Sequence, residues 1–199
     1  MDEGIWVNPG DIIHVRGNTR AILTGERVAL NFIQRLCGIS TYTRKFVDKI
    51  KNNKATILDT RKTTPTLRYL EKYAVRMGGG ANHRMGLYDR ILIKENHIKI
   101  AGGIKNTLSR VNGEIEVKNL REAKEAIKYG AKHLLLDNMS LKTAKKVVTL
   151  TEGKNILLEY SGNVTLENVK EIADTGVDYI SVGALTHSYK SIDISLLLR

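Results

Sequence analysis

The sequence predicts an α/β protein built on a parallel sheet of about six strands. From Ala55 onward, short apolar segments alternate with amphipathic segments of helical spacing, and this alternation is typical of parallel strands joined by right-handed crossovers. The strand segments are nearly continuous apolar runs, as in a sheet that is covered on both faces. About six units are too few for a complete eight-stranded barrel, so an incomplete barrel and a doubly wound open sheet both fit the pattern.

Each element follows from a local pattern of apolar residues and turn residues. The predicted strands span residues 55–59, 90–94, 114–118, 133–137, 155–160 and 178–183. The predicted helices between them span residues 66–77, 120–129, 141–151 and 165–175, with a further short helix after Gly102-Gly103. Upstream, we expect a strand over residues 12–16, a helix that Thr24 caps and Gly38 ends, and a second helix from Ser40.

Length and composition are those of a globular protein. The chain has 199 residues, of which 42% are hydrophobic and 27% charged, which excludes general disorder and suits one domain or one domain with a small appendage. No apolar run approaches the roughly 20 residues of a membrane span, and the N-terminus lacks the apolar core of a secretory signal. The single cysteine, Cys37, cannot form an internal disulfide, so we expect a protein of the reducing cytoplasm.

The chain is strongly basic. It has 32 Lys and Arg against 21 Asp and Glu, a formal net charge of +11, which favours nucleic acid, a membrane surface, or a phosphorylated or carboxylated small molecule as partner. Aromatic residues make up only 6% and no known nucleic-acid-binding motif is present, which argues against nucleic acid. The sequence also lacks a nucleophile elbow, a P-loop and the zinc-ligand spacing of known motifs. We therefore expect a reaction driven by positioning and electrostatics rather than covalent catalysis.

Polar residues gather where the predicted strands end, which is where parallel α/β proteins place their active sites. The cations of this set are Arg61, Lys62, His83, Arg84 and Lys94, the carboxylates are Glu116 and Asp137, and the small residues are Ser161, Gly162 and Gly183. Clustered cations suit phosphates and carboxylates, and two facing carboxylates suit ribose hydroxyls or a Mg²⁺ ion that bridges phosphate oxygens. Because unpaired buried charges destabilise a fold, we expect a binding site rather than a structural device.

Seven segments of the sequence are similar to a known family. They read ERVALNFIQRLCGIST, LDTRKTTPTLRYLEKYAVRMGGGANHRMGLYD, LIKENHI, EIEV, LLLDNM, LEYSG and TGVDYISVGALTHS. From about Gly4 to its C-terminus, the chain resembles the quinolinate phosphoribosyltransferases (nicotinate-nucleotide pyrophosphorylases, carboxylating). The second and the last segments are long and specific, so chance agreement is implausible.

The resemblance implies an enzyme, a pentosyltransferase of NAD biosynthesis. It would join quinolinate to phosphoribosyl pyrophosphate (PRPP), with loss of pyrophosphate and CO₂, to give nicotinate mononucleotide. The resemblance further implies Mg²⁺ with PRPP, no tightly bound organic cofactor, a homodimer or higher homo-oligomer, and neither nucleic acid nor a membrane as partner. The alternatives are an inactive or fragmentary family member and a basic nucleic-acid-binding protein.

The resemblance also assigns roles to individual residues. By position, Arg61, Lys62, His83, Arg84 and Lys94 would hold the pyridine dicarboxylate and the phosphates, Glu116 and Asp137 would hold the ribose and its Mg²⁺, and Ser161, Gly162 and Gly183 would hold the 5′-phosphate. Of these, Lys62, Lys94, Glu116 and Asp137 are the candidate catalytic residues. Arg27 matches a family arginine that reaches the active site of the neighbouring subunit.

The domain organisation is likewise an implication of the resemblance. Residues 1–39 would be a remnant of an N-terminal α/β sandwich domain with its connecting helix, residues 40–188 an incomplete α/β barrel, and residues 189–199 a C-terminal tail. Two positions depart from the family pattern. Tyr160 stands where a small residue is usual, and we expect it to crowd the phosphate loop. Asn163 stands where glycine is usual, and asparagine tolerates positive φ.

Overall fold

The sheet is parallel throughout and stays open. The computed structural model describes residues 3–198, and its strands are β1 (Thr56–Leu58), β2 (Leu92–Ile93), β3 (Glu114–Val117), β4 (His133–Asp137), β5 (Leu157–Ser161) and β6 (Tyr179–Ser181). They lie in the order β1-β6-β5-β4-β3-β2, and each neighbouring pair is parallel. The edge strands β1 and β2 do not pair in the described part of the chain, so the prediction of an incomplete six-stranded barrel is confirmed.

Helices connect the strands and extend beyond them. They are α1 (Thr19–Lys49), α2 (Arg68–Met77), α3 (Glu95–Ala101), α4 (Ile104–Leu108), α5 (Leu120–Lys128), α6 (Leu141–Thr151), α7 (Val169–Ala173) and α8 (Ala184–His187). The sequence did not predict α3 and α8, because segments of seven and four residues are too short to show a helical period. Among the residues described, no helix is both long and apolar enough to cross a membrane.

A single helix, α1, replaces the two helices that the sequence predicted on either side of Gly38. It begins after Asn18, whose side-chain oxygen accepts a hydrogen bond from Ala21 N, and it continues for 31 residues. The C-terminal tail crosses the helix at Gly38, where a Cβ would clash with the carbonyl group of Lys190. Gly38 therefore permits close packing of the tail instead of ending the helix. The predicted domain boundary at residues 39 and 40 lies inside α1.

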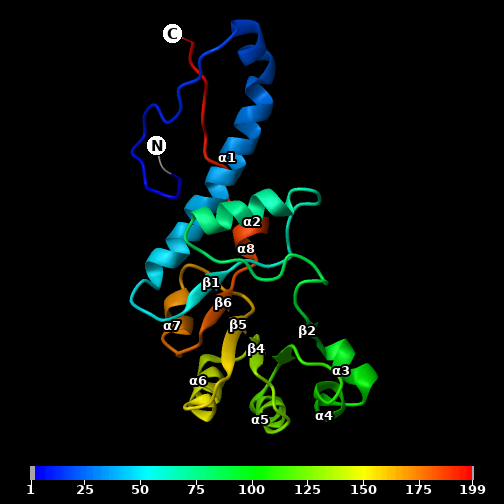
Figure 1. Ribbon diagram of the computed structural model, residues 1–199. Helices are drawn as coiled ribbons and strands as arrows, with labels where there is room; N and C mark the ends of the chain where they lie inside the picture. The colour runs from blue at the N-terminus through cyan, green and yellow to red at the C-terminus, as the bar shows by residue number, and fades with distance from the viewer. Residues whose placement is uncertain (1–2, 199) are drawn as a thin grey trace.

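The C-terminal tail runs back along α1 (Figure 1). Ile192 N donates to the Gln34 carbonyl oxygen over 3.1 Å, and Gln34 Nε2 donates to the Ile194 carbonyl oxygen over 2.7 Å. These bonds join the end of the described chain to the middle of the long helix.

The predicted strand over residues 12–16 does not form. In the described part of the chain, β1 is the first strand, and Ile13 and Val15 are 57% and 63% exposed. A strand is stable only beside other strands or against a packed face, and this segment has neither.

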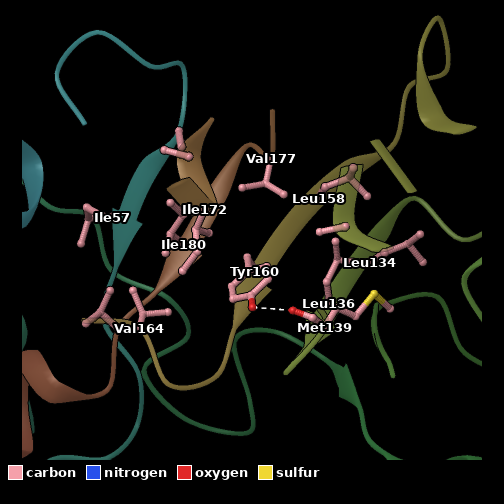
Figure 2. Packing of buried hydrophobic residues seen from close by; sticks show 14 of the residues in the cluster. Ile57, Leu134, Leu136, Met139, Leu158, Tyr160, Val164, Ile172, Val177 and Ile180 are labelled. Atoms are coloured by element: carbon pink, nitrogen blue, oxygen red, sulfur yellow. Dashed lines mark hydrogen bonds between the residues drawn. The ribbon is translucent and has the colours of Figure 1, made fainter. Parts of the chain in front are cut away.

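The outer face of the sheet carries the apolar core. Ile57, Leu134, Leu136, Leu158 and Ile180 come from four strands and lie together in the core cluster (Figure 2). They alternate along each strand with the residues of the inner face, because successive side chains of a strand point to opposite faces. Of the polar residues predicted at strand ends, Glu116, Asp137 and Ser161 lie within strands and therefore share the other face.

Tyr160 belongs to the outer face as well. Its neighbours in β5, Glu159 and Ser161, point to the inner face. The Tyr160 hydroxyl donates to the carbonyl oxygen of Met139 over 2.6 Å in the core (Figure 2). The expectation that Tyr160 crowds the phosphate loop is wrong, because the alternation of the strand directs the ring away from Ser161.

Candidate active site

The inner face of the sheet is polar, and strand register arranges its side chains in rows. Asp137, Ser161 and Ser181 form the row nearest the carboxyl ends of the strands. Glu116, Leu135 and Glu159 form the next row, and Glu114 and His133 form the row at the amino ends. The predicted carboxylates Glu116 and Asp137 thus lie on one face, near the rim that the sequence predicts as the site.

A cation faces a carboxylate where β2 and β3 end. Lys94 Nζ donates to Glu116 Oε2 over 3.2 Å. The side chain of Glu116 is only 12% exposed, whereas that of Lys94 is about half exposed. The carboxylate is therefore held within the sheet, and the ammonium group remains accessible from the rim. Beside them, Lys118 bonds to Glu95.

The loops after β4 and β5 form a compact turn that depends on left-handed backbone. Asn138, Gly162 and Asn163 have φ values of 50°, 110° and 48°. Asn163 Nδ2 donates to Asn138 Oδ1 over 3.2 Å, and Asn138 Nδ2 donates to Asp137 Oδ1 over 3.0 Å. A Cβ on Gly162 would clash with the side chain of Asn138. The turn thus requires glycine at position 162, and it joins Asp137 to the predicted phosphate loop.

A pocket opens at the carboxyl ends of β1 and β6. It is lined by Arg35, Lys62, Thr63, Thr64, Thr186, His187, Tyr189 and Ser191. Thr186 Oγ1 donates to the Lys62 carbonyl oxygen over 2.8 Å. A Cβ on Gly183 would lie 3.1 Å from Lys62 Cδ and from His187 Nε2. The structure therefore brings Lys62 and Gly183 together, although the sequence placed them more than a hundred residues apart.

Two arginines follow β1 and α2, and Arg84 Nη1 donates to the Arg90 carbonyl oxygen over 3.4 Å. Arg61 is exposed, and Arg84 is buried. Burial lowers the pKa of the Arg84 guanidinium, and the positive charge of Arg61 lowers it further. An anion bound beside the two guanidinium groups would be attracted by both and would offset their mutual repulsion.

His83 points onto the inner face, between its middle row and the row at the amino ends of the strands. Its Nε2 lies 3.0 Å from Glu114 Oε2 and 3.4 Å from Glu159 Oε2. Burial lowers the pKa of His83, but the hydrogen bonds and charges of these two carboxylates outweigh burial and raise it to about 9. Two carboxylates of the inner face thus hold the His83 imidazole.

Arg27 also lies apart from the other candidates. It is an exposed residue of α1, in the half of the helix that extends beyond the sheet (Figure 1). Within the described part of this chain, no hydrogen bond or ion pair joins Arg27 to the rim residues.

A buried ion pair that the sequence did not predict lies next to the carboxyl end of β1. Lys72 of α2 bonds to Asp59, which follows β1, and both side chains are almost completely buried. Asp59 also accepts hydrogen bonds from Asn82 Nδ2 and His83 N. Burial raises the pKa of the Asp59 carboxyl despite these partners. The pair thus fixes the segment that carries His83 and Arg84 against the end of β1.

A second buried carboxylate, Glu71, holds the loop after β1. It accepts from Arg35 Nη2 over 2.6 Å and from Thr64 N over 3.1 Å, and Arg35 also bonds to Thr64 Oγ1. The consecutive Glu71-Lys72 was visible in the sequence. Charged residues in a helix are usually exposed, and here the partners that bury them, Arg35 of α1 for Glu71 and Asp59 for Lys72, lie elsewhere in the chain.

Comparison with known proteins decides the family. Residues 39–197 match the model of the quinolinate phosphoribosyl transferase C-terminal domain, and residues 1–37 match that of the N-terminal domain. The chain belongs to the quinolinate phosphoribosyltransferase family. This confirms the resemblance that the seven sequence segments indicate.

Curated members of the quinolinate phosphoribosyltransferase family are similar over nearly the whole chain. A probable nicotinate-nucleotide pyrophosphorylase (carboxylating) of Bacillus subtilis (strain 168) is 47% identical over 98% of this chain and 70% of its own length. A mitochondrial quinolinate phosphoribosyltransferase (decarboxylating) of Nicotiana glauca is 42% identical over 96% of this chain and 63% of its own length. The chain thus spans about two thirds of these relatives.

Solved structures of this family share the fold. The nicotinate-nucleotide pyrophosphorylase of Francisella tularensis has a TM-score of 0.86 and 49% identity, over 90% of this chain and 66% of that chain. NadC from Streptococcus pyogenes has a TM-score of 0.84 and 42% identity, over 89% of this chain and 65% of that chain.

Proposed function

We propose that this chain catalyses phosphoribosyl transfer from PRPP to quinolinate with decarboxylation, which yields nicotinate mononucleotide, pyrophosphate and CO₂. One structural observation supports this proposal in addition to family membership. The rim of the sheet combines accessible cations with two inward-facing carboxylates and a glycine-dependent turn, which is the set of groups that a dicarboxylate and a phosphorylated ribose require.

The proposed reaction does not require the protein to form a covalent bond with either substrate. The pyridine nitrogen of quinolinate is itself the nucleophile, so no general base is needed for the attack on the anomeric carbon. The protein has to align the two substrates and stabilise the charge of the departing pyrophosphate. Lys62 and Lys94 are exposed cations at opposite parts of the rim, and we assign them this electrostatic role. Arg61 and Arg84 would bind the carboxylates of quinolinate.

Glu116 and Asp137 would face the ribose of PRPP. They belong to adjacent strands and to the same face, so their oxygens can accept hydrogen bonds from neighbouring sugar hydroxyls. Ser161, Gly162 and Gly183 end the next two strands and would bind the 5′-phosphate through backbone N–H groups and the serine hydroxyl.

The donor set at Glu116 and Asp137 fits Mg²⁺. Both offer carboxylate oxygens, the ligands that Mg²⁺ prefers, and Mg²⁺ commonly binds through one or two carboxylates together with substrate phosphates. When bound with PRPP, the ion would neutralise pyrophosphate charge. The nearby Lys94 keeps Glu116 oriented towards the rim.

We further propose that the protein acts in the cytoplasm as a homodimer or higher homo-oligomer. The exposed position of Arg27 on the extending half of α1 suits a contact with the rim of a neighbouring subunit. In that arrangement Arg27 would add a cation to a site to which its own chain does not bring it.

The activity is tested by incubating the protein with PRPP, Mg²⁺ and quinolinate labelled in its 2-carboxylate. We expect nicotinate mononucleotide by liquid chromatography and labelled CO₂ in equal amounts. Nicotinate, which lacks the 2-carboxylate, serves as the control substrate and should release no CO₂. Absence of both products from a dimeric preparation that binds PRPP would contradict the proposed function.

A further inference from the structure

Arg68 contacts both of the segments that carry the arginines assigned to quinolinate. It is the first residue of α2, and its side chain is partly buried. Arg61 belongs to the loop after β1, and Arg84 belongs to the segment after α2. Arg68 has no part in the reaction as proposed above, although its guanidinium group joins these two segments.

The guanidinium group of Arg68 uses all three of its nitrogens. Nη2 donates to the Arg61 carbonyl oxygen over 3.3 Å, and Nε donates to Thr63 Oγ1 over 2.9 Å. Nη1 donates to the carbonyl oxygen of Met85, the residue that directly follows Arg84, over 3.0 Å. A planar guanidinium holds its acceptors in a fixed arrangement. One rigid group therefore sets the position of the loop after β1 relative to the segment of Arg84.

The charge of Arg68 does not serve the stability of α2. All three acceptors are neutral, and within residues 3–198 no ion pair joins Arg68 to a carboxylate. The helix dipole also disfavours a cation in the first turn of a helix. A positive charge at this position adds to the positive potential around Arg61 and Arg84, and this potential favours an anion beside them.

The helix that carries Arg68 is anchored in the turn that follows. Glu71 accepts a hydrogen bond from Arg35 of α1 over 2.6 Å, and Lys72 bonds to Asp59. Glu71 and Lys72 are both almost completely buried. The guanidinium group of Arg68 is therefore presented from a fixed backbone.

The turn after Arg84 is held by its own hydrogen bonds. Met85 N and Gly86 N donate to the two carboxylate oxygens of Asp89 over 2.6 Å and 2.9 Å. Arg84 Nη1 donates to the Arg90 carbonyl oxygen over 3.4 Å. Because this turn is closed on itself, a bond to the Met85 carbonyl oxygen also fixes the adjacent Arg84.

The Arg61 side chain remains available to a ligand. It is exposed, and within the described part of the chain it forms no hydrogen bond or ion pair, whereas its carbonyl oxygen is held by Arg68. The charge of Arg61 lowers the pKa of Arg84, so the two guanidinium groups are close enough to interact. Quinolinate has carboxylates on adjacent ring carbons, and two cations at a defined separation suit such a ligand.

We propose that Arg68 is a positioning residue that sets the separation of Arg61 and Arg84, so that each binds one carboxylate of quinolinate. Arg68 acts through these two residues and does not itself touch the substrate. The inference rests on the function proposed above, and it makes Arg68 a determinant of affinity for adjacent dicarboxylates.

Calorimetric titration of quinolinate, and of PRPP with Mg²⁺, into Arg68→Lys tests this role. Lysine keeps the charge but lacks the planar fork that holds three acceptors, so we expect quinolinate affinity to be at least about tenfold lower. PRPP affinity should change less than about threefold, because Thr186 holds the Lys62 carbonyl oxygen independently of Arg68. Arg76→Lys, at an exposed arginine of the same helix, is the matched control and should bind both ligands as the wild type does.

Benzene-1,2-dicarboxylate separates the carboxylates from the ring nitrogen. It keeps the two adjacent carboxylates and lacks the nucleophile, so its affinity for Arg68→Lys should fall as that of quinolinate does. Thr63→Val is a second, milder variant, because it removes one acceptor of Arg68 and keeps the shape of the side chain. We expect it to lower quinolinate affinity at least about threefold, with circular dichroism confirming that both variants are folded.

The outcomes distinguish the role of Arg68 from the proposed function. Quinolinate affinity that is unchanged in both variants, or an equal loss of quinolinate and PRPP affinity in Arg68→Lys, would overturn the role of Arg68 and leave the proposed function intact. If the wild type does not bind quinolinate, the proposed function fails and the role of Arg68 fails with it.

Discussion

A side chain on Gly162 would collide with the side chain of Asn138. The two residues follow neighbouring strands, β5 and β4, and both have positive φ, 110° and 50°. The loop that would bind the 5′-phosphate is therefore shaped by a contact from the adjacent loop, which also holds Asp137 through Asn138. A change at either residue should therefore alter the binding of both the 5′-phosphate and the ribose of PRPP.

We predict that Gly162→Ala weakens PRPP binding at least about tenfold, because the methyl group must displace Asn138 and because alanine is strained at this φ. Calorimetric titration of PRPP in the presence of Mg²⁺ measures the effect. Gly25→Ala is the control, since a Cβ there meets no other atom within 4 Å. Unchanged PRPP affinity in Gly162→Ala would show that this turn is not part of the phosphate site.

The buried pair of Lys72 and Asp59 predicts a large loss of stability. Lys72→Met leaves the Asp59 carboxylate buried without its cation, and we expect the free energy of unfolding in urea to fall by about 3–5 kcal/mol. The control is Lys54→Met, which breaks an exposed pair with Asp178 and should cost less than about 1 kcal/mol. If both variants lose the same small amount, the Asp59 pair does not support the fold as described.

The two glycines of α1 should respond to alanine in opposite directions. Gly25→Ala removes a helix-destabilising residue from an open position and should stabilise the protein by up to about 1 kcal/mol. Gly38→Ala should displace the tail at Lys190 and increase amide hydrogen exchange at Ile192, whose N–H bonds to Gln34. Protection of Ile192 that is equal in both variants would contradict the packing role of Gly38.

Tyr160→Phe should lower stability without changing PRPP affinity, because the Tyr160 hydroxyl lies in the core and not in the site. The variant loses the hydrogen bond to the Met139 carbonyl oxygen, so we expect the free energy of unfolding to fall by about 1 kcal/mol. Because the ring points away from Ser161, PRPP affinity should not change. Tyr129→Phe, at the C-terminal cap of α5, is the control for stability. A large loss of PRPP affinity in Tyr160→Phe would indicate that the hydroxyl faces the PRPP site, and would contradict its position in the core.

The sequence predicted the sheet well because the strands are apolar runs bounded by clear turn residues. The predicted helix end at Gly38 was wrong, because this glycine lies within a helix and packs against a tail more than 150 residues later in the sequence. The prediction also failed over residues 12–16, because an alternating pattern cannot show whether a neighbouring strand exists. Both errors arise from contacts distant in the sequence, which local patterns do not contain.

The candidate site was predicted in part for the same reason. Strand ends are local features, so Lys94, Glu116 and Asp137 could be assigned to one rim from the alternation of strands and helices alone. The direction of a side chain in a loop is not local, and the contacts of His83 with Glu114 and Glu159 were not predicted. Glu71 and Lys72 were missed because their burial depends on partners distant in the sequence, Arg35 and Asp59.

We propose that the strand-end residues form one site for an anionic pyridine. Calorimetric titration of quinolinate into the wild type, Arg61→Ala and the control Arg110→Ala tests it most directly, because Arg61 follows β1 and Arg110 is an exposed arginine after α4. We predict equal affinities for the wild type and Arg110→Ala, and an affinity at least about tenfold weaker for Arg61→Ala, since a charge-assisted hydrogen bond is lost. Three identical titration curves would show that Arg61 does not take part in quinolinate binding and would contradict a single strand-end site.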